Sequence, residues 1–171
     1  LSQTLQDLLD DREQLVFVKK NIRGKGMKGA VGTAASYKEL VAESSVSSIE
    51  LENMVMEELG IKAYDAATQI YSRKQDLRII EALSSIACTL HKFSLDFRIL
   101  QSPPIGEFSE PFGKMQVGSS AMPFKRNPIN SEKIDSLSRI VENAYQSAWN
   151  NAATTVLERS LDDSANRRIF I

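Results

Sequence analysis

Residues 72–100, SRKQDLRIIEALSSIACTLHKFSLDFRIL, form a run that contains neither glycine nor proline. The apolar residues recur every three or four positions, which is the spacing of one face of an α-helix. The series is Leu77, Ile80, Leu83, Ala87, Leu90, Phe93, Phe97 and Leu100. A helix of this length would extend about 40 Å. Because Ile79, Ile86 and Leu95 widen the stripe, we expect neighbours on more than one face.

The rest of the chain also predicts helices. Residues 1–20 carry apolar positions at roughly helical spacing, and residues 130–153 predict a second long helix. Shorter helices are expected at about 33–42 and 47–60, the latter with a serine N-cap at residue 47 or 48. Evidence for strands is poor. Long helices joined by glycine- or proline-rich turns predict an all-α fold, a long-helix bundle.

Composition excludes several classes of function. Apolar residues make up 42% of the chain and charged residues 25%, which is typical of a folded globular domain. The net charge of −1 gives no electrostatic reason to expect a nucleic acid or a membrane surface as partner. Cys88 is the single cysteine and lies among apolar residues, so we expect a packed thiol. A lone thiol fits a reducing compartment such as the cytoplasm.

Both ends of the sequence look like cuts within a longer polypeptide. Leu1 already belongs to a helical pattern, and residues 167–171 end on apolar residues without a helix terminator. We therefore expect residues 1–171 to form a single truncated helical domain.

A glycine-containing run, residues 24–29, matches the G-x-G-x-x-G pattern of dinucleotide-binding turns. That pattern binds a dinucleotide only after a buried strand and at the start of a crossover helix. Here a helix precedes the run and we expect no strand–helix–strand unit after it, so a turn between helices is favoured. The basic residues Arg23, Lys25 and Lys28 remain candidates for facing an anion.

The two long helices are joined by about 28 residues that hold all five prolines of the chain. Connections of this length inside a compact domain are usually functional or disordered. The segment closes with residues 118–128, GSSAMPFKRNP, which place two hydroxyls, a lysine and an amide within eleven residues. These groups suit the binding of a carboxylate and the transfer of a proton. Composition alone leaves a polar turn as an equal alternative.

Residues 118–128 match G-S-S-x-M-P-x-K-x-N-P, the signature loop of the fumarase–aspartase–argininosuccinate lyase superfamily, at every fixed position. Within that superfamily the chain resembles the adenylosuccinate lyases. The resembling residues are Ala121, Arg126 and the blocks 29–33, 69–74 and 158–168. The resemblance covers nearly the whole chain.

This resemblance implies an enzyme that eliminates fumarate from adenylosuccinate, giving AMP, and from the succinylated aminoimidazole carboxamide ribonucleotide of purine synthesis. It implies most of the central helical domain, with the signature loop at about 102–128 and the C-terminal region starting at about 156–171. It also implies a homotetramer with active sites shared between subunits. No metal and no organic cofactor are implied.

The resemblance assigns roles within and beside the loop. Ser119 would be the general base, which needs a local field because a free serine holds its proton tightly. Lys125 and Asn127 would bind the succinyl carboxylates, with Ser120 and Met122 also contacting the substrate.

Residues outside the loop also receive roles from the resemblance. Glu132 would pair with a catalytic histidine, and Lys133 stands where many relatives have arginine. Gln69 would form a hydrogen bond to the substrate. The nucleotide phosphate or ribose would be held by Arg159, Ser164 and Arg168. Without the resemblance, Glu132 is ordinary first-turn helix charge and each arginine a solvated surface residue.

His91, the only histidine, lies within the helical run 72–100, and we interpret it as structural. The resemblance places the histidine that protonates the leaving nitrogen upstream of the residues matched here, so the chain alone is expected to be inactive. Two alternatives remain: another lyase of the superfamily, argininosuccinate lyase or fumarase-like, and a catalytically inactive helical relative.

Overall fold

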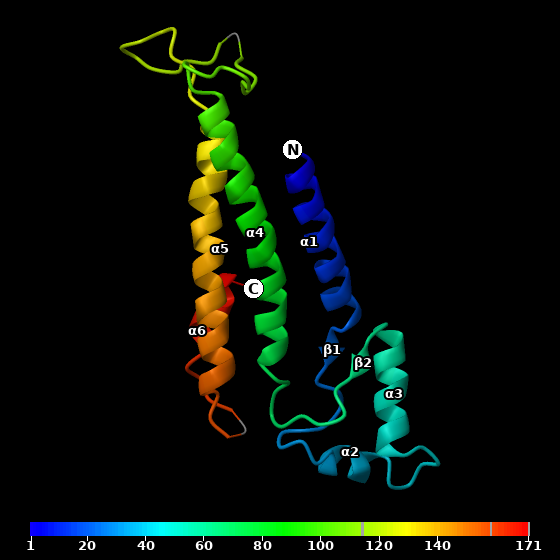
Figure 1. Cartoon of the computed structure of the whole chain (residues 1–171). Coiled ribbons are helices and arrows are strands. Elements are labelled where there is room, and N and C mark those ends of the chain that lie inside the picture. Colours follow the sequence, from blue (N-terminus) through cyan, green and yellow to red (C-terminus); the bar gives the residue numbers. More distant parts are fainter. Residues whose placement is uncertain (114, 158, 171) are drawn as a thin grey trace.

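The computed structural model describes residues 1–113, 115–157 and 159–170. Six helices and two very short strands follow one another along these residues (Figure 1). They are α1 (Ser2–Lys20), β1 (Arg23–Gly24), α2 (Ala35–Leu40), α3 (Ser48–Glu58), β2 (Lys62–Ala63), α4 (Lys74–Leu100), α5 (Ile129–Thr154) and α6 (Ser164–Phe170). The prediction of an all-α helical bundle is confirmed, and both long helices lie within two residues of their expected bounds.

Helices α4 and α5 form an antiparallel pair that is the centre of the molecule (Figure 1). Their contact is centred on Leu77, Ile80 and Ala148, which are buried. The connection between them, residues 101–128, lies at one end of the pair, and α6 folds back beside α5 from the other end (Figure 1). The long helices therefore hold the signature loop and the C-terminal residues apart.

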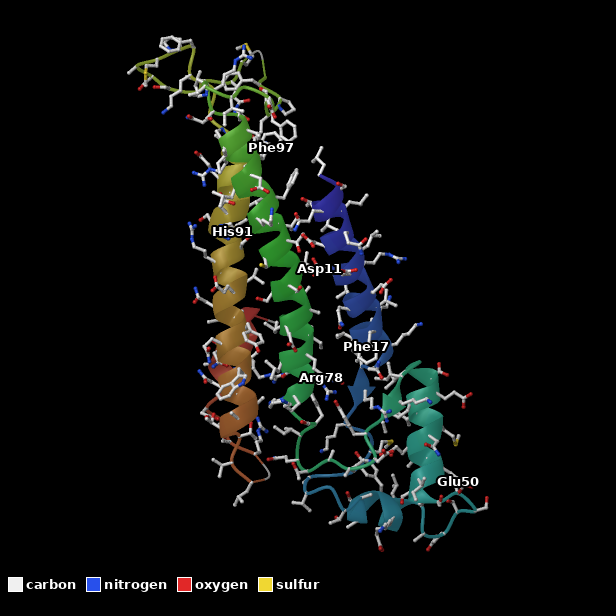
Figure 2. The ribbon with its side chains drawn as sticks, in the orientation of Figure 1. Asp11, Phe17, Glu50, Arg78, His91 and Phe97 are labelled. Carbon is white, nitrogen blue, oxygen red and sulfur yellow. The ribbon has the colours of Figure 1, made fainter. Side chains whose placement is uncertain are left out.

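Helix α1 packs against α4 through a polar contact (Figure 2). The buried carboxylate of Asp11 accepts hydrogen bonds from Ser85 Oγ at 2.6 Å and from Thr89 Oγ1 at 2.7 Å. The apolar positions of α1 point elsewhere, with Leu5 and Phe17 60% and 63% exposed. The helical spacing of residues 1–20 thus predicted the helix, but its apolar stripe does not face α4.

Apolar side chains are also exposed on the long helices. They include Leu83, Leu90, Leu137, Ile140 and Trp149. Cys88 is exposed as well, so the prediction of a packed thiol was wrong: Ala87 and Thr89 on either side face neighbours, and the turn of the helix carries Cys88 outward. Within the described ranges, no helix combines the length and apolarity that crossing a bilayer requires.

The glycine-containing run 24–29 begins inside β1, which pairs in parallel with β2 through Arg23↔Lys62 and Gly24↔Ala63. Because α2 and α3 connect the two parallel strands, a strand–helix–strand unit is present, and the expectation that there would be none was wrong. The strands are only two residues long, and the next helix begins at Ala35 rather than within the glycines. Residues 24–29 therefore do not form a dinucleotide-binding turn.

The basic residues of this run have partners within the chain. Lys28 Nζ forms an ion pair with Glu52 at 2.7 Å, and Lys25 Nζ donates to the carbonyl oxygen of Gly29. Arg23 Nη1 donates to the carbonyl oxygen of Ala63 at 3.4 Å. The charge of Lys28 is therefore neutralised within the segment, whereas the described contacts of Lys25 and Arg23 are to uncharged carbonyl oxygens.

Helix α3 begins at the expected serine. Ser47 is the N-cap, its Oγ accepts from the backbone N–H of Glu50, and Glu50 accepts from the backbone N–H of Ser47 at 2.7 Å. This reciprocal pair is a capping box. The hydrogen bonds from Ser47 hold the pKa of the Glu50 carboxyl below its ordinary value.

Candidate functional site

The signature loop folds around the hydroxyl of Ser119. Ser119 Oγ accepts hydrogen bonds from the backbone N–H groups of Ala121 and Met122, each at 3.3 Å. Asn127 Nδ2 donates to the carbonyl oxygen of Gly118 at 3.2 Å, which ties the two ends of the loop together. Two N–H dipoles thus point at one serine oxygen, an arrangement that stabilises negative charge on that atom.

The loop closes through a contact that requires glycine. A Cβ atom added to Gly118 would stand 1.8 Å from the carbonyl oxygen of Lys125. No side chain can occupy that position, so the backbone at residue 125 passes directly against residue 118. This approach brings the backbone of Lys125 beside the residue that directly precedes Ser119.

A pocket of about 520 Å³ lies where the loop meets the ends of α4 and α5. Lys125, Asn127 and Arg98 are among the residues that line it. Gln101, which also lines this pocket, connects two parts of the loop: its side chain donates to Arg126 O at 3.3 Å and accepts from Glu110 N at 2.8 Å. The amide of Asn127 and the ammonium of Lys125 suit an anionic ligand, whereas the guanidinium of Arg98 forms an ion pair with the buried carboxylate of Asp135.

Glu110 caps α5, a role that the sequence did not reveal. Its carboxylate accepts hydrogen bonds from Asn130 N at 3.0 Å and from Ser131 N and Oγ, each at 2.8 Å. Desolvation raises the pKa of Glu110, but the N–H groups of Ser131 and Asn130 outweigh it, so the pKa lies below its ordinary value. The cap therefore ties the connection 101–128 to the first turn of α5.

Glu132 and Lys133 follow the cap in the first turn of α5, and both are exposed. Ser120, Met122 and Lys125 are exposed as well. The loop therefore gathers seven of the candidate residues at one end of the helix pair. These are Ser119, Ser120, Met122, Lys125, Asn127, Glu132 and Lys133.

The other end of the pair carries a second pocket, of about 330 Å³, which we call the arginine pocket. It is lined by Arg73, Arg159, Asp163, Ser164, Arg167 and Arg168. The three C-terminal candidates Arg159, Ser164 and Arg168 are thus brought together. Arg168 Nη1 donates to Ser164 Oγ at 2.9 Å, which fixes the guanidinium beside the hydroxyl. Glu158, the first residue of the block 158–168, lies outside the described residues.

Three residues that line the arginine pocket belong to a group of buried and half-buried polar residues that sequence reasoning missed. It consists of Tyr71, Arg73, Asp76, Asp163 and Arg167, and we call it the anchor cluster. Arg73 Nε lies 2.6 Å from Asp163 Oδ2, and Arg167 Nε lies 2.8 Å from Asp76 Oδ2. Tyr71 donates its hydroxyl proton to Asp76 Oδ1 at 2.8 Å and accepts from Arg167 Nη2 at 2.9 Å.

The pKa of Tyr71 reflects this position. Burial raises it, and the hydrogen bond to the carboxylate of Asp76 raises it further, so the phenol keeps its proton. The sequence offered only a weak signal for the cluster. Its members form pairs at three- and four-residue spacing, Arg73 with Asp76 and Asp163 with Arg167, which are also typical of exposed helix surfaces.

Gln69, the remaining candidate, is exposed and precedes the anchor cluster by two residues. The backbone just before it packs against Gly32, where an added Cβ would lie 2.1 Å from the carbonyl oxygen of Ala67. Gly32 has a φ of +82°, in the left-handed region that favours glycine. The block 29–33 therefore supports the segment that carries Gln69.

The two groups of candidates do not meet within one chain. Helix α4 has 27 residues and is about 40 Å long, and it separates the signature loop from the arginine pocket (Figure 1). His91 lies between them on α4, where its Nε2 is 4.0 Å from Oδ1 of the buried Asp135 on α5 (Figure 2). This is a contact between helices, as expected of a structural histidine. Among the described residues, no cluster of three His, Cys, Asp or Glu side chains could hold a metal ion.

Comparisons with known proteins agree with the geometry. A family model described as a lyase matches residues 1–142. The adenylosuccinate lyase of Schistosoma mansoni is 44% identical over 98% of the chain, and that of Saccharomyces cerevisiae is 40% identical over 98%. The chain spans about a third of these relatives, 35% and 34% of their lengths.

Two solved structures share the fold. A 3-carboxy-cis,cis-muconate lactonizing enzyme from Pseudomonas putida superposes with a TM-score of 0.81 at 21% identity, covering 98% of this chain and 36% of that enzyme. A class II fumarase from Schistosoma mansoni superposes with a TM-score of 0.71 at 19% identity, covering 99% of this chain and 39% of the fumarase. The chain therefore shares the arrangement of its long helices with both structures.

Proposed function

Because the chain belongs to the lyase family whose model matches residues 1–142, we propose that it forms most of the central helical domain of an adenylosuccinate lyase. The complete enzyme eliminates fumarate from adenylosuccinate to give AMP. It also cleaves the succinylated aminoimidazole carboxamide ribonucleotide in the same way. The identity of 38–44% to several adenylosuccinate lyases supports this choice.

Ser119 is the base in this proposal. Its alkoxide removes a proton from the succinyl carbon, the electron pair forms the double bond of fumarate, and the carbon–nitrogen bond breaks. A second proton then goes to the departing nitrogen. The observation that carries the assignment is the pair of N–H groups, from Ala121 and Met122, that donate to Ser119 Oγ. Donors of this kind lower the energy of an alkoxide.

The succinyl carboxylates bind beside the base. Lys125 and Asn127 line the pocket at the root of the loop, and their ammonium and amide groups are donors suited to carboxylates. Ser120 and Met122 contact the substrate from the same turn. Glu132 orients the histidine that acts as the acid, and Lys133 supplies a further cation at the start of α5. No cofactor or metal takes part in the proposed reaction.

The arginine pocket holds the nucleotide phosphate. Arg159 and Arg168 form no ion pair with any described residue, so their guanidinium groups are available to an anion. Guanidinium forks bind phosphate through paired hydrogen bonds. Ser164 adds a hydroxyl, and Gln69 forms a hydrogen bond to the substrate from the neighbouring segment.

One active site then requires more than one copy of the chain. A nucleotide cannot reach from the arginine pocket to Ser119 along the roughly 40 Å of α4. We therefore propose a homotetramer in which helices of different copies pack side by side and share each active site. The exposed apolar residues of α1, α4 and α5 supply the surface for that packing. The exposed thiol of Cys88 suits a reducing compartment, and we place the enzyme in the cytoplasm.

The test is fumarate release by the full-length protein from adenylosuccinate, argininosuccinate and malate. We expect release from adenylosuccinate alone, abolished by Ser119→Ala with the oligomer intact. Ser136→Ala, which removes an exposed hydroxyl from α5, is the matched control and should keep full activity. Wild-type turnover by Ser119→Ala would refute the base, and release from argininosuccinate or malate instead would refute the substrate. An inactive wild-type protein would favour a helical relative without catalysis.

A further inference from the structure

The anchor cluster joins segments that are far apart in the sequence. Tyr71, Arg73 and Asp76 precede or begin α4, whereas Asp163 and Arg167 precede or lie in α6. Each arginine lies within 4 Å of both carboxylates: Arg73 is 2.6 Å from Asp163 and 3.8 Å from Asp76, and Arg167 is 2.8 Å from Asp76 and 3.9 Å from Asp163. The four charged groups thus alternate in sign around a closed ring.

The charges of the anchor cluster neutralise one another. The side chains of Arg73, Asp76 and Asp163 are 5%, 6% and 3% exposed, and buried charges are stable only when paired. Both arginines also stack near the ring of Tyr71, at 5.3 and 6.0 Å from its centroid. These two guanidinium groups are therefore paired with carboxylates, in contrast to Arg159 and Arg168, which line the same pocket without a described ion pair.

The cluster is continuous with the arginine pocket. Asp163 directly precedes Ser164, and Arg167 directly precedes Arg168. Helix α6 has only seven residues, too few to be stable alone, so contacts with the rest of the protein must hold it in place. Besides the cluster, the described contact that holds it is the amide pair of Asn151 and Asn166.

We propose that the anchor cluster is the positioning network of the arginine pocket, and that Tyr71 is its central positioning residue. The four alternating charges hold the start of α6 against α4, so that Ser164 and Arg168 face the substrate phosphate at a fixed distance. This inference rests on the proposed function, because it assigns the pocket to a nucleotide phosphate. It separates two kinds of arginine: Arg159 and Arg168 bind the phosphate, and Arg73 and Arg167 hold the helix that carries Ser164 and Arg168.

Tyr71→Phe in the full-length protein is the test, because it removes one hydroxyl and leaves the aromatic ring of residue 71 in place. The two hydrogen bonds lost are those to Asp76 and from Arg167. Kinetics are compared on adenylosuccinate and on its dephosphorylated nucleoside. We expect KM for adenylosuccinate to rise about tenfold with kcat nearly unchanged, since misplacing a binding group has effects of this order or larger. The value of kcat/KM for the nucleoside should stay the same.

Tyr64→Phe is the matched control. Tyr64 also donates a part-buried hydrogen bond at the same end of α4, to Gln75 at 3.1 Å, but it lies outside both the arginine pocket and the anchor cluster. We expect its kinetic constants to equal those of the wild type. If Tyr71→Phe leaves KM unchanged, or lowers kcat/KM equally for the nucleotide and the nucleoside, the positioning role is wrong.

Calorimetric binding of AMP separates this inference from the proposed reaction, because it needs no turnover. Weaker AMP binding by Tyr71→Phe than by the wild type would support the positioning role of the anchor cluster. This holds even if the wild type releases no fumarate, because the absence of fumarate would refute only the proposed reaction. Fumarate release by the wild type, together with equal AMP affinities for the two proteins, would refute the anchor cluster alone.

Discussion

The carbonyl oxygen of Lys125 occupies the space in which a Cβ atom on Gly118 would stand, only 1.8 Å away. Residues 118–125 are therefore closed into a turn by a backbone contact between Gly118 and Lys125. Because Ser119 follows Gly118 directly, this contact sets the position of the proposed base relative to the proposed carboxylate-binding residues.

Gly118→Ala should open the loop. The methyl group would push Lys125 away and separate it from Ser119, so we expect kcat to fall by about 100-fold, as for other displacements of reacting groups. Gly113→Ala in the same connection is the control, because its Cβ would meet only Gln116 at an ordinary 3.8 Å. Steady-state fumarate release measures both, and equal activities of the two variants would contradict the closed loop.

Asp11→Ala should loosen α1. The hydroxyl groups of Ser85 and of the buried Thr89 would lose their acceptor, so we expect the free energy of unfolding to fall by about 1–3 kcal/mol. Asp10→Ala, which removes the neighbouring exposed carboxylate, should change it by less than about 0.5 kcal/mol. Urea denaturation of the full-length protein provides the comparison. Equal midpoints would show that the polar contact does not hold α1.

The Glu110 cap should make stability depend on pH. Its pKa in the folded protein lies below the ordinary value of 4.5, so the folded state binds the proton less readily than the unfolded state. The stabilisation is complete above pH 4.5 and is lost as the pH falls below it through the folded pKa. Glu110→Gln should lower the free energy of unfolding by roughly 0.5–1 kcal/mol at neutral pH, and this difference should vanish in acid.

Glu107→Gln is the control for that titration. Glu107 is an exposed carboxylate of the same connection, outside the cap of α5. Its substitution should change the free energy of unfolding by less than about 0.5 kcal/mol, as surface substitutions generally do. A constant difference between wild type and Glu110→Gln from neutral pH down to pH 3 would contradict the charged cap.

Gly32→Ala and Gly60→Ala should differ in their effect on catalysis. Both glycines have positive φ, so alanine costs each about 1–2 kcal/mol of stability. At Gly32 the methyl group would also displace the carbonyl of Ala67 and shift Gln69, whereas at Gly60 it meets nothing within 4 Å. We expect a raised KM only for Gly32→Ala, measured by fumarate release. Identical KM values would remove the proposed support of Gln69.

The sequence predicted those parts of the fold that depend on local physics. Helix α4 follows from apolar spacing without glycine or proline, and α3 follows from the capping serine at residue 47. Strands β1 and β2 could not be predicted, because two residues are too few to show an alternating pattern. The outward apolar face of α1 was missed because periodicity identifies a stripe, but not the neighbour that covers it.

The candidate site was predicted as far as its residues form consecutive motifs. The loop 118–128 and the block 158–168 both occur as continuous stretches, and the structure brings together the residues of the loop and those of the described part of the block, 159–168. The anchor cluster was missed because Arg167 meets Asp76 across 91 positions, a contact that exists only once α5 has returned along α4. Glu110 was missed for the same reason, since it caps a helix that begins some twenty residues later.

Mixing two inactive full-length variants, Ser119→Ala and Arg168→Gln, tests most directly whether the two ends of the chain serve one active site. After subunit exchange at equal amounts, sites that take the loop from an Arg168→Gln subunit and the arginine pocket from a Ser119→Ala subunit are intact. We predict recovery of about a quarter of wild-type fumarate release, as random assembly of a symmetric oligomer gives. No recovery, with exchange verified by native mass spectrometry, would contradict an active site shared between copies of the chain.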